Sequence, residues 1–185
     1  MKKTKKELTK EKIHKALLLL LEKEKIDKIK ITQLCRLAAI NRGTFYLHYD
    51  CIEDVFEELY EVVIIDLKET YNYSTYSEQT FYIQNINAQK IKIFFHIEKF
   101  KTFYKIILSQ KENNSYYFML FDQIRINLQN SFIYPTETKD DVEYFIGYHV
   151  NAIIGLILIW YQRDFKETPE EMNYILHSIY LKALK

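Results

Sequence analysis

The stretch from Ile31 to Leu59 constrains the fold of this chain more than any other. Apolar residues recur at helical spacing on both sides of residues 39–41, and those three residues suit a tight turn. The pattern predicts a short helix over about 32–38, a second over about 42–49, and a longer helix directly after it. Two short helices joined by a tight turn and braced by a third form a helix-turn-helix.

Helix-breaking residues are rare in the rest of the chain, which has three Gly and two Pro among 185 residues. Thr9 is the expected cap of a first helix, and no strand pattern rises above the helical one. We therefore predict an all-α protein with two domains. An N-terminal three-helix domain over residues 1–52 is joined by a long helix to a C-terminal helical bundle over residues 53–185.

The formal net charge of +1 conceals an asymmetry. Residues 1–49 carry 13 Lys and Arg against 5 Asp and Glu, a net charge of +8. Residues 50–185 carry 13 against 20, a net charge of −7. A basic segment on an acidic body indicates binding of a polyanion at one end, although a merely solvated basic N-terminus would have the same composition.

The second short helix carries the side chains that a nucleic acid would meet. Phe45 and Tyr49 lie four residues apart and are predicted to face the core, which leaves their polar neighbours outside. Arg42 can reach a phosphate or a guanine edge, and Gly43 allows close approach of the backbone. Taken singly, several of these residues would also suit an ordinary helix surface. The predicted DNA-contacting residues are Thr32, Asn41, Arg42, Gly43, Thr44, Tyr46, Leu47 and His48.

This segment closely resembles the DNA-binding domain of the TetR family of bacterial transcriptional regulators. The resemblance covers about residues 9–60, and its matching residues are Ala38 to Tyr46, His48-Tyr49 and Glu53-Asp54-Val55. More loosely, the C-terminal segment is similar to a branch that includes regulators of dihydroxyacetone kinase operons, through Gly147, Ile154-Gly155-Leu156, Trp160 and residues 165–172.

The resemblance implies a cytoplasmic, nucleoid-associated bacterial protein that binds double-stranded DNA as a homodimer at a palindromic operator. We expect a repressor that a small ligand releases, although an activator would use the same DNA-binding segment. Three residues depart from the family pattern. Lys30 replaces a capping Thr, Ile52 replaces a Lys that clamps a phosphate, and Ala39 replaces the Gly before the turn.

The helix expected over about 138–165 is the best candidate for the dimer contact, together with the last helix. Small residues recur in it every four positions, which would let another helix approach closely, although this stripe could also pack within one subunit. The predicted interface residues are Gly147, Asn151, Ile154, Gly155 and Leu158.

The segment Val142–Tyr161 is long enough to span a bilayer. Because Glu143, His149 and Asn151 lie inside it, a largely buried helix explains it better, and no membrane partner is expected. The aromatic residues between about 94 and 121 suit either a dense core or a ligand pocket with His96 or His149 as polar handles. No effector residue is assigned.

Neither a Gly-rich phosphate loop nor a Cys/His metal cluster occurs in the sequence, and its five His are scattered. We therefore expect no enzymatic activity, no cofactor and no metal. The two cysteines, Cys35 and Cys51, fit a reduced compartment. The alternative to a DNA-binding repressor is a helical co-regulator or activator that works through a protein partner.

Overall fold

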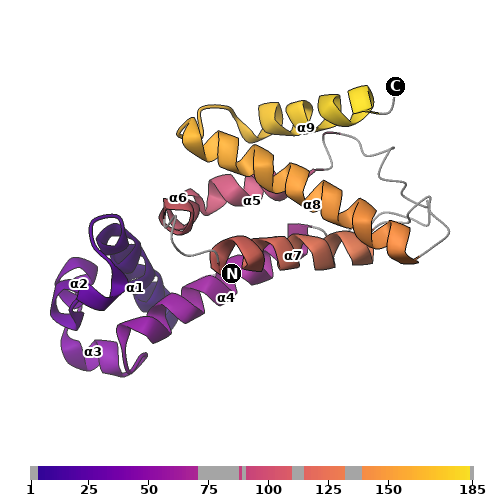
Figure 1. Cartoon of the computed structure of the whole chain (residues 1–185). Coiled ribbons are helices and arrows are strands. Elements are labelled where there is room, and N and C mark those ends of the chain that lie inside the picture. Colours follow the sequence, from indigo (N-terminus) through magenta and orange to yellow (C-terminus); the bar gives the residue numbers. More distant parts are fainter. Residues whose placement is uncertain (1–3, 71–87, 89–90, 110–114, 132–138, 184–185) are drawn as a thin grey trace. The chain divides into compact units, whose positions relative to one another are not determined.

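The computed structural model describes residues 4–70, 88, 91–109, 115–131 and 139–183, and the regular elements within these ranges are all helices (Figure 1). The all-α prediction is therefore confirmed. The chain divides into two compact units, Met1–Val63 and Ile64–Lys185. Helix α4, Ile52–Thr70, contributes residues to both units. The domain boundary predicted after residue 52 falls at the start of this helix and stays a prediction.

The N-terminal unit begins with α1, Lys5–Leu21, which starts earlier than its predicted cap. The hydroxyl of Thr4 accepts a hydrogen bond from the Glu7 amide at 3.2 Å, and the Glu7 carboxylate accepts one from the Thr4 amide at 2.7 Å. This capping box places Thr9 inside the helix, where its hydroxyl donates to the Lys5 carbonyl. Thr9 was the wrong cap because Lys12, three residues later, has no acceptor to complete the box.

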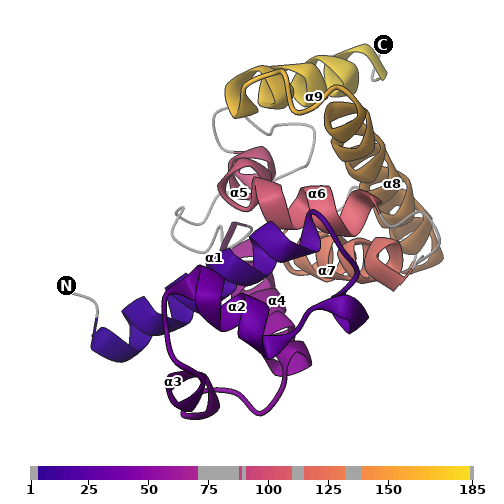
Figure 2. The ribbon, with the colours of Figure 1, turned by 90° about the vertical axis from the view of Figure 1, so that its left-hand side faces the viewer.

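A 3-10 turn, Ile26–Lys28, precedes the helix-turn-helix of α2, Ile31–Ala38, and α3, Arg42–Tyr46 (Figure 2). In α2, Leu34, Cys35 and Ala38 are buried, whereas Leu37 is 48% exposed. The buried residues of α2 thus follow the spacing of a narrow helical stripe. The core of this unit consists of Ile13, Ala16, Leu17, Ile29, Leu34, Cys35, Ala38, Phe45, Tyr49, Ile52 and Val55.

The C-terminal unit is a bundle of the remaining helices and the last turns of α4 (Figure 1). Its helices are α5, Ile93–Lys99, α6, Lys101–Ser109, α7, Ser115–Ser131, α8, Lys139–Gln162, and α9, Pro169–Ala183.

The start of α9 agrees with its sequence signals. Thr168 Oγ1 accepts from the Glu171 amide at 3.2 Å, and the Glu171 carboxylate accepts from the Thr168 amide at 2.7 Å. Pro169 occupies the first helical position, where a missing amide hydrogen costs nothing.

Aromatic side chains fill much of the core of the C-terminal unit. Trp160 is fully buried, contacts Phe94 and Phe165 edge-on, and donates from Nε1 to the Glu167 carbonyl at 3.0 Å. Phe103 and Tyr104 are buried as well. The aromatic residues were expected to form either a dense core or a ligand pocket, and these buried side chains favour the dense core.

Helix α8 has two apolar faces. By length and composition alone, its segment Asp141–Gln162 could cross a membrane, and 33% of the most apolar window is buried. A core helix passes the same test, and Ile146, Val150 and Ile157 are buried within the bundle. The opposite face exposes Tyr144, Tyr148 and Ile159, and exposed apolar surface of this kind is commonly covered by another molecule.

Candidate nucleic-acid interface

The turn of the helix-turn-helix is fixed by Asn41. Its backbone is extended, and its Oδ1 accepts a hydrogen bond from the Thr44 amide at 2.7 Å. Asn41 thus caps α3. Because the cap uses the amide oxygen, Nδ2 is the group of Asn41 that remains suited to a phosphate.

Helix α3 is seated on the core by two aromatic rings. Phe45 is fully buried and Tyr49 is 5% exposed, with their ring centroids 5.9 Å apart. Both were predicted to face inward. α3 is shorter than expected and ends at Tyr46. Beyond that residue, the amides of His48 and Tyr49 both donate to the Phe45 carbonyl, so the backbone makes a further turn.

The outward residues of this segment are those predicted to contact DNA. Tyr46 is 55% exposed and Leu47 is 80% exposed, whereas Thr44 and His48 are half-buried. The remaining predicted contact residues, Thr32, Asn41, Arg42 and Gly43, are exposed. The exposures agree with a role in binding, but contact with DNA stays a prediction for each residue.

Four polar residues, which sequence reasoning missed, connect the segment after α3 to α1 and α4. The hydroxyl of Tyr49 lies 3.1 Å from Nε2 of His14, and Lys10 Nζ lies 2.6 Å from the Glu58 carboxylate. Burial, followed by the Glu58 charge and hydrogen bond, raises the pKa of Tyr49, and burial also lowers the pKa of His14. Both rings are therefore neutral near pH 7. No sequence spacing links these residues, which lie on α1, on α4 and in the segment that follows α3.

The start of α4 is held by its own acidic residue. The Asp54 carboxylate accepts hydrogen bonds from the Cys51 amide at 3.1 Å and the Asp50 amide at 3.0 Å. A hydrogen bond with the Cys51 side chain, followed by these two, lowers the pKa of Asp54. Ile52, where the family pattern has Lys, is 5% exposed and belongs to the core. The substitution that removes a phosphate clamp thus adds an apolar core residue.

The other two departures from the family pattern also have visible consequences. The Lys30 amide donates to Gln33 Oε1 at 2.8 Å, but Lys30 offers no side-chain acceptor in return, so half of a capping box is present. Ala39 ends α2 in the left-handed conformation, with φ 53° and ψ 47°, where glycine is favoured.

The predicted dimer contacts lie at different depths of α8. Asn151 is exposed and donates to the Gly147 carbonyl at 2.8 Å, whereas Gly147, Gly155 and Leu158 are half-buried. Ile154, in contrast, is 2% exposed and packs inside its own unit. Its apolar character suggested a place in the predicted interface, but it lies on the buried face of the helix.

Sequence reasoning missed the large side chains beside the small residues of α8. We use the name α8/α9 face for the exposed sides of these two helices. Its exposed apolar residues are Tyr144, Tyr148 and Ile159 on α8, and Tyr174, Ile175, Ile179 and Leu181 on α9.

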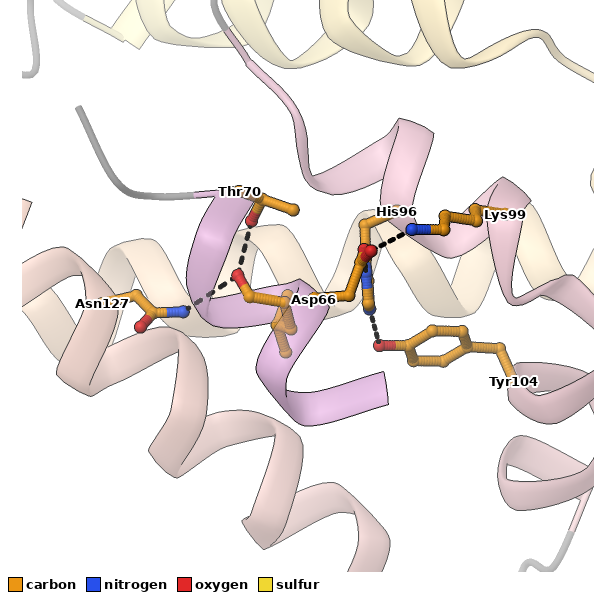
Figure 3. Close-up of polar contacts among 7 residues, drawn as sticks. Asp66, Thr70, His96, Lys99, Tyr104 and Asn127 are labelled. Atoms are coloured by element: carbon orange, nitrogen blue, oxygen red, sulfur yellow. Dashed lines mark hydrogen bonds and ion pairs between the residues drawn. The ribbon is translucent and has the colours of Figure 1, made fainter. Parts of the chain in front are cut away.

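The C-terminal unit also contains a polar cluster around a buried histidine (Figure 3). His96 is 2% exposed, and its Nδ1 and Nε2 lie 2.7 Å from Asp66 Oδ1 and 2.8 Å from the Tyr104 hydroxyl. Lys99 pairs with the other Asp66 oxygen. Burial opposes ionisation of Asp66, but the hydrogen bonds from Lys99 and His96 prevail and lower its pKa. His96 was predicted as a polar residue for ligand binding, but both of its ring nitrogens have protein partners.

The neighbouring contacts tie the end of α4 to α7. Asn127 Nδ2 donates to the Leu67 carbonyl at 3.5 Å, and the Thr70 hydroxyl donates to the same carbonyl at 2.7 Å (Figure 3). Gln123 in turn donates to Asn127 at 3.0 Å. These bonds hold the last turn of the helix that also contributes to the N-terminal unit.

A helix-turn-helix unit followed by a separate helical bundle defines a class of transcriptional regulators. The chain itself matches, over residues 84–182, a TetR family described as "Transcriptional regulator C-terminal region". Because this match covers more than half of the chain, the protein belongs to the TetR family of transcriptional regulators. No curated protein sequence matches it.

Solved structures of other regulators have the same fold. The dihydroxyacetone kinase operon activator DhaS is 17% identical with a TM-score of 0.62, over 95% of both chains. A TetR transcriptional regulator from Streptococcus agalactiae is 17% identical with a TM-score of 0.57, over 95% of this chain and 94% of that one. The fatty acid degradation regulator FadR from Bacillus halodurans is 15% identical with a TM-score of 0.60, over 100% and 99%.

Proposed function

We propose that the protein is a repressor that binds a palindromic operator as a homodimer. The observation that carries the proposal is the outer surface of α3. Phe45 and Tyr49 anchor this helix, while Arg42, Tyr46 and Leu47 remain exposed in the basic part of the chain. A short helix anchored on one side and exposed on the other suits insertion into the major groove.

The expected contacts follow from side-chain chemistry. Arg42 donates to a guanine edge or a phosphate, and Tyr46 and His48 donate to phosphates. Thr32 stands near the start of α2 and replaces the phosphate contact that Lys30 does not supply. Asn41, Gly43, Thr44 and Leu47 complete the proposed surface.

The α8/α9 face supports the proposed homodimer. A palindromic site requires two recognition helices related by two-fold symmetry. Asn151, Gly155 and Tyr148 lie on the exposed side of α8, and a second copy of α8 and α9 would cover them. Gly147 and Leu158 border this surface, whereas Ile154 supports it from inside.

A small effector would act by favouring one spacing of the two recognition helices over another. Helix α4 is the proposed connection, since it contributes residues to both units. We further propose that the protein acts in the bacterial cytoplasm, on nucleoid DNA, and has no enzymatic activity.

An activator that works through a protein partner is the second candidate. The exposed apolar residues of the α8/α9 face could be covered by a different protein as well as by a second copy. DhaS, a neighbour in fold, is named an operon activator. This candidate predicts a stable complex with another protein, and a helical co-regulator that does not itself bind DNA would in addition select no DNA motif.

The experiment is selection of bound fragments from a random DNA pool at low salt, using the full chain. Arg42→Ala and Tyr46→Ala are the test variants, and Arg125→Ala on α7 is the matched control for loss of an arginine. We expect a palindrome that the control retains and both test variants lose, with binding that weakens steeply as salt rises. A folded dimer that selects no motif would reject the proposal.

A further inference from the structure

Gly43 and Leu47, the C-cap residue of α3, form the outermost line of this segment. Each of them is two positions from the fully buried Phe45, and two positions on a helix correspond to a rotation of about 200°. Gly43 and Leu47 therefore both lie almost opposite Phe45. They are four residues apart and therefore lie one above the other on the same side. Leu47 keeps helical backbone angles, with φ −73° and ψ −11°.

Nothing in the described part of the chain requires a glycine at position 43. The residue has no positive φ, and an added Cβ would meet the Asn41 Oδ1 at 3.4 Å and no closer atom. The exposed Leu47 carries only hydrocarbon atoms, and side chains in helical conformation point back toward the preceding turn, where Gly43 lies. The outermost line of this polar helix is thus apolar.

We propose that Leu47 contacts the C5 methyl group of a thymine on the floor of the major groove, while Gly43 lets the backbone approach. This inference rests on the proposed function. The thymine methyl is the apolar group that a base pair presents in the major groove, and a leucine can neither donate to nor accept from a phosphate. The net charge of +8 on residues 1–49 favours DNA as the occupant of this surface.

Leu47 suits the methyl group better than Thr44 does. Thr44 also carries a methyl, but it is half-buried and its amide is held by the Asn41 cap. Leu47 is 80% exposed, so its truncation removes no core contact. The assignment makes thymine the preferred base at one position in each half-site.

The test replaces each thymine of the selected operator by deoxyuridine, one symmetric pair at a time. This change removes the methyl group and leaves base pairing unchanged. For the wild-type protein, we expect one substituted pair to weaken binding by about fourfold per half-site, the effect of one buried methyl group. Leu47→Ala should bind the thymine operator more weakly by a similar or larger factor and show no further loss with deoxyuridine.

Three results would overturn the assignment. Wild-type protein could be indifferent to every deoxyuridine, or Leu47→Ala could keep the wild-type sensitivity. Alternatively, Thr44→Ser, which keeps the hydroxyl and removes the methyl, could abolish the sensitivity in place of Leu47→Ala. Failure to select any operator would instead reject the proposed function, and this inference with it. Unchanged melting temperatures would show that all variants are folded.

Discussion

Nδ1 of His96 lies 2.7 Å from Oδ1 of Asp66, so a buried imidazole on α5 is tied to a carboxylate on α4. The pKa of Asp66 is lowered, which keeps its carboxylate ionised and makes it an acceptor. His96 must then donate from Nδ1 and accept at Nε2 from the Tyr104 hydroxyl, 2.8 Å away. A directed chain of hydrogen bonds from Tyr104 through His96 to Asp66 therefore links three helices.

The free energy of unfolding should fall as the pH drops below about 6.5, the ordinary pKa of histidine. Burial lowers the pKa of His96 in the folded protein, although the hydrogen bond and charge of Asp66 partly oppose it. Between the folded and unfolded pKa values, only the unfolded chain takes up the proton, so acid favours unfolding. Urea unfolding at pH 7.5 and 5.5 measures the difference.

His96→Asn is the matched variant for this experiment, because it keeps a donor near Asp66 and does not titrate. Burial also lowers the pKa values of His14 and His149, which add pH dependence of the same sign. The variant should therefore be less stable at pH 7.5 but lose less stability on acidification. Equal pH dependence in both proteins would show that His96 does not contribute.

Ala39→Gly should stabilise the N-terminal unit. Ala39 has φ 53°, and a left-handed conformation costs a residue with a Cβ about 1 kcal/mol or more. Because glycine also gains freedom in the unfolded chain, we expect a net gain of about 0.5 kcal/mol. Thermal unfolding should show a small rise in melting temperature. Ala38→Gly, one residue earlier in helical conformation, should lower it, and a lower value for both variants would contradict the assignment.

Lys30→Thr should also raise stability, by about 1 kcal/mol. The Thr hydroxyl would accept from the Gln33 amide and complete the capping box, of which the Gln33 side chain already supplies half. Lys30→Ala removes the same charge without adding an acceptor, so it separates the cap from the charge. A gain from both variants would attribute the effect to charge instead.

The helix-turn-helix was largely predictable because its determinants are local. Asn41 caps α3 from three residues before Thr44, and the spacing of Phe45 and Tyr49 sets the buried side of the segment. The cap at Thr168 is similarly local. The first helix was predicted to be capped by Thr9, but its cap is Thr4, five residues earlier, which forms a capping box with Glu7.

The features that the sequence did not predict depend on contacts between residues far apart in the chain. Asp66 and His96 are 30 residues apart, and no periodicity relates them. Similarly, Ile154 and Gly155 are adjacent in a strongly apolar helix, yet one is buried and the other is half-buried. When nearly every position of a helix is apolar, hydrophobicity cannot identify the side that faces the core.

Gly155→Ala should have opposite effects on the subunit and on the dimer. An added Cβ meets no atom within 4 Å in the subunit, and alanine favours a helix over glycine by up to about 1 kcal/mol. If a second copy of α8 approaches there, as proposed, the same methyl group is forced against it. We expect slightly higher thermal stability of the subunit and a dimer dissociation constant raised about tenfold, the effect of modest overpacking.

Sedimentation velocity over a range of concentrations measures the dimer, and circular dichroism measures the melting temperature. Gly43→Ala is the matched control, because it makes the same change on α3. It should leave the dimer intact and weaken operator binding, since its methyl group would stand between the backbone of α3 and the DNA. If Gly155→Ala strengthens or preserves the dimer while Gly43→Ala behaves as expected, the close helix contact lies elsewhere on the α8/α9 face.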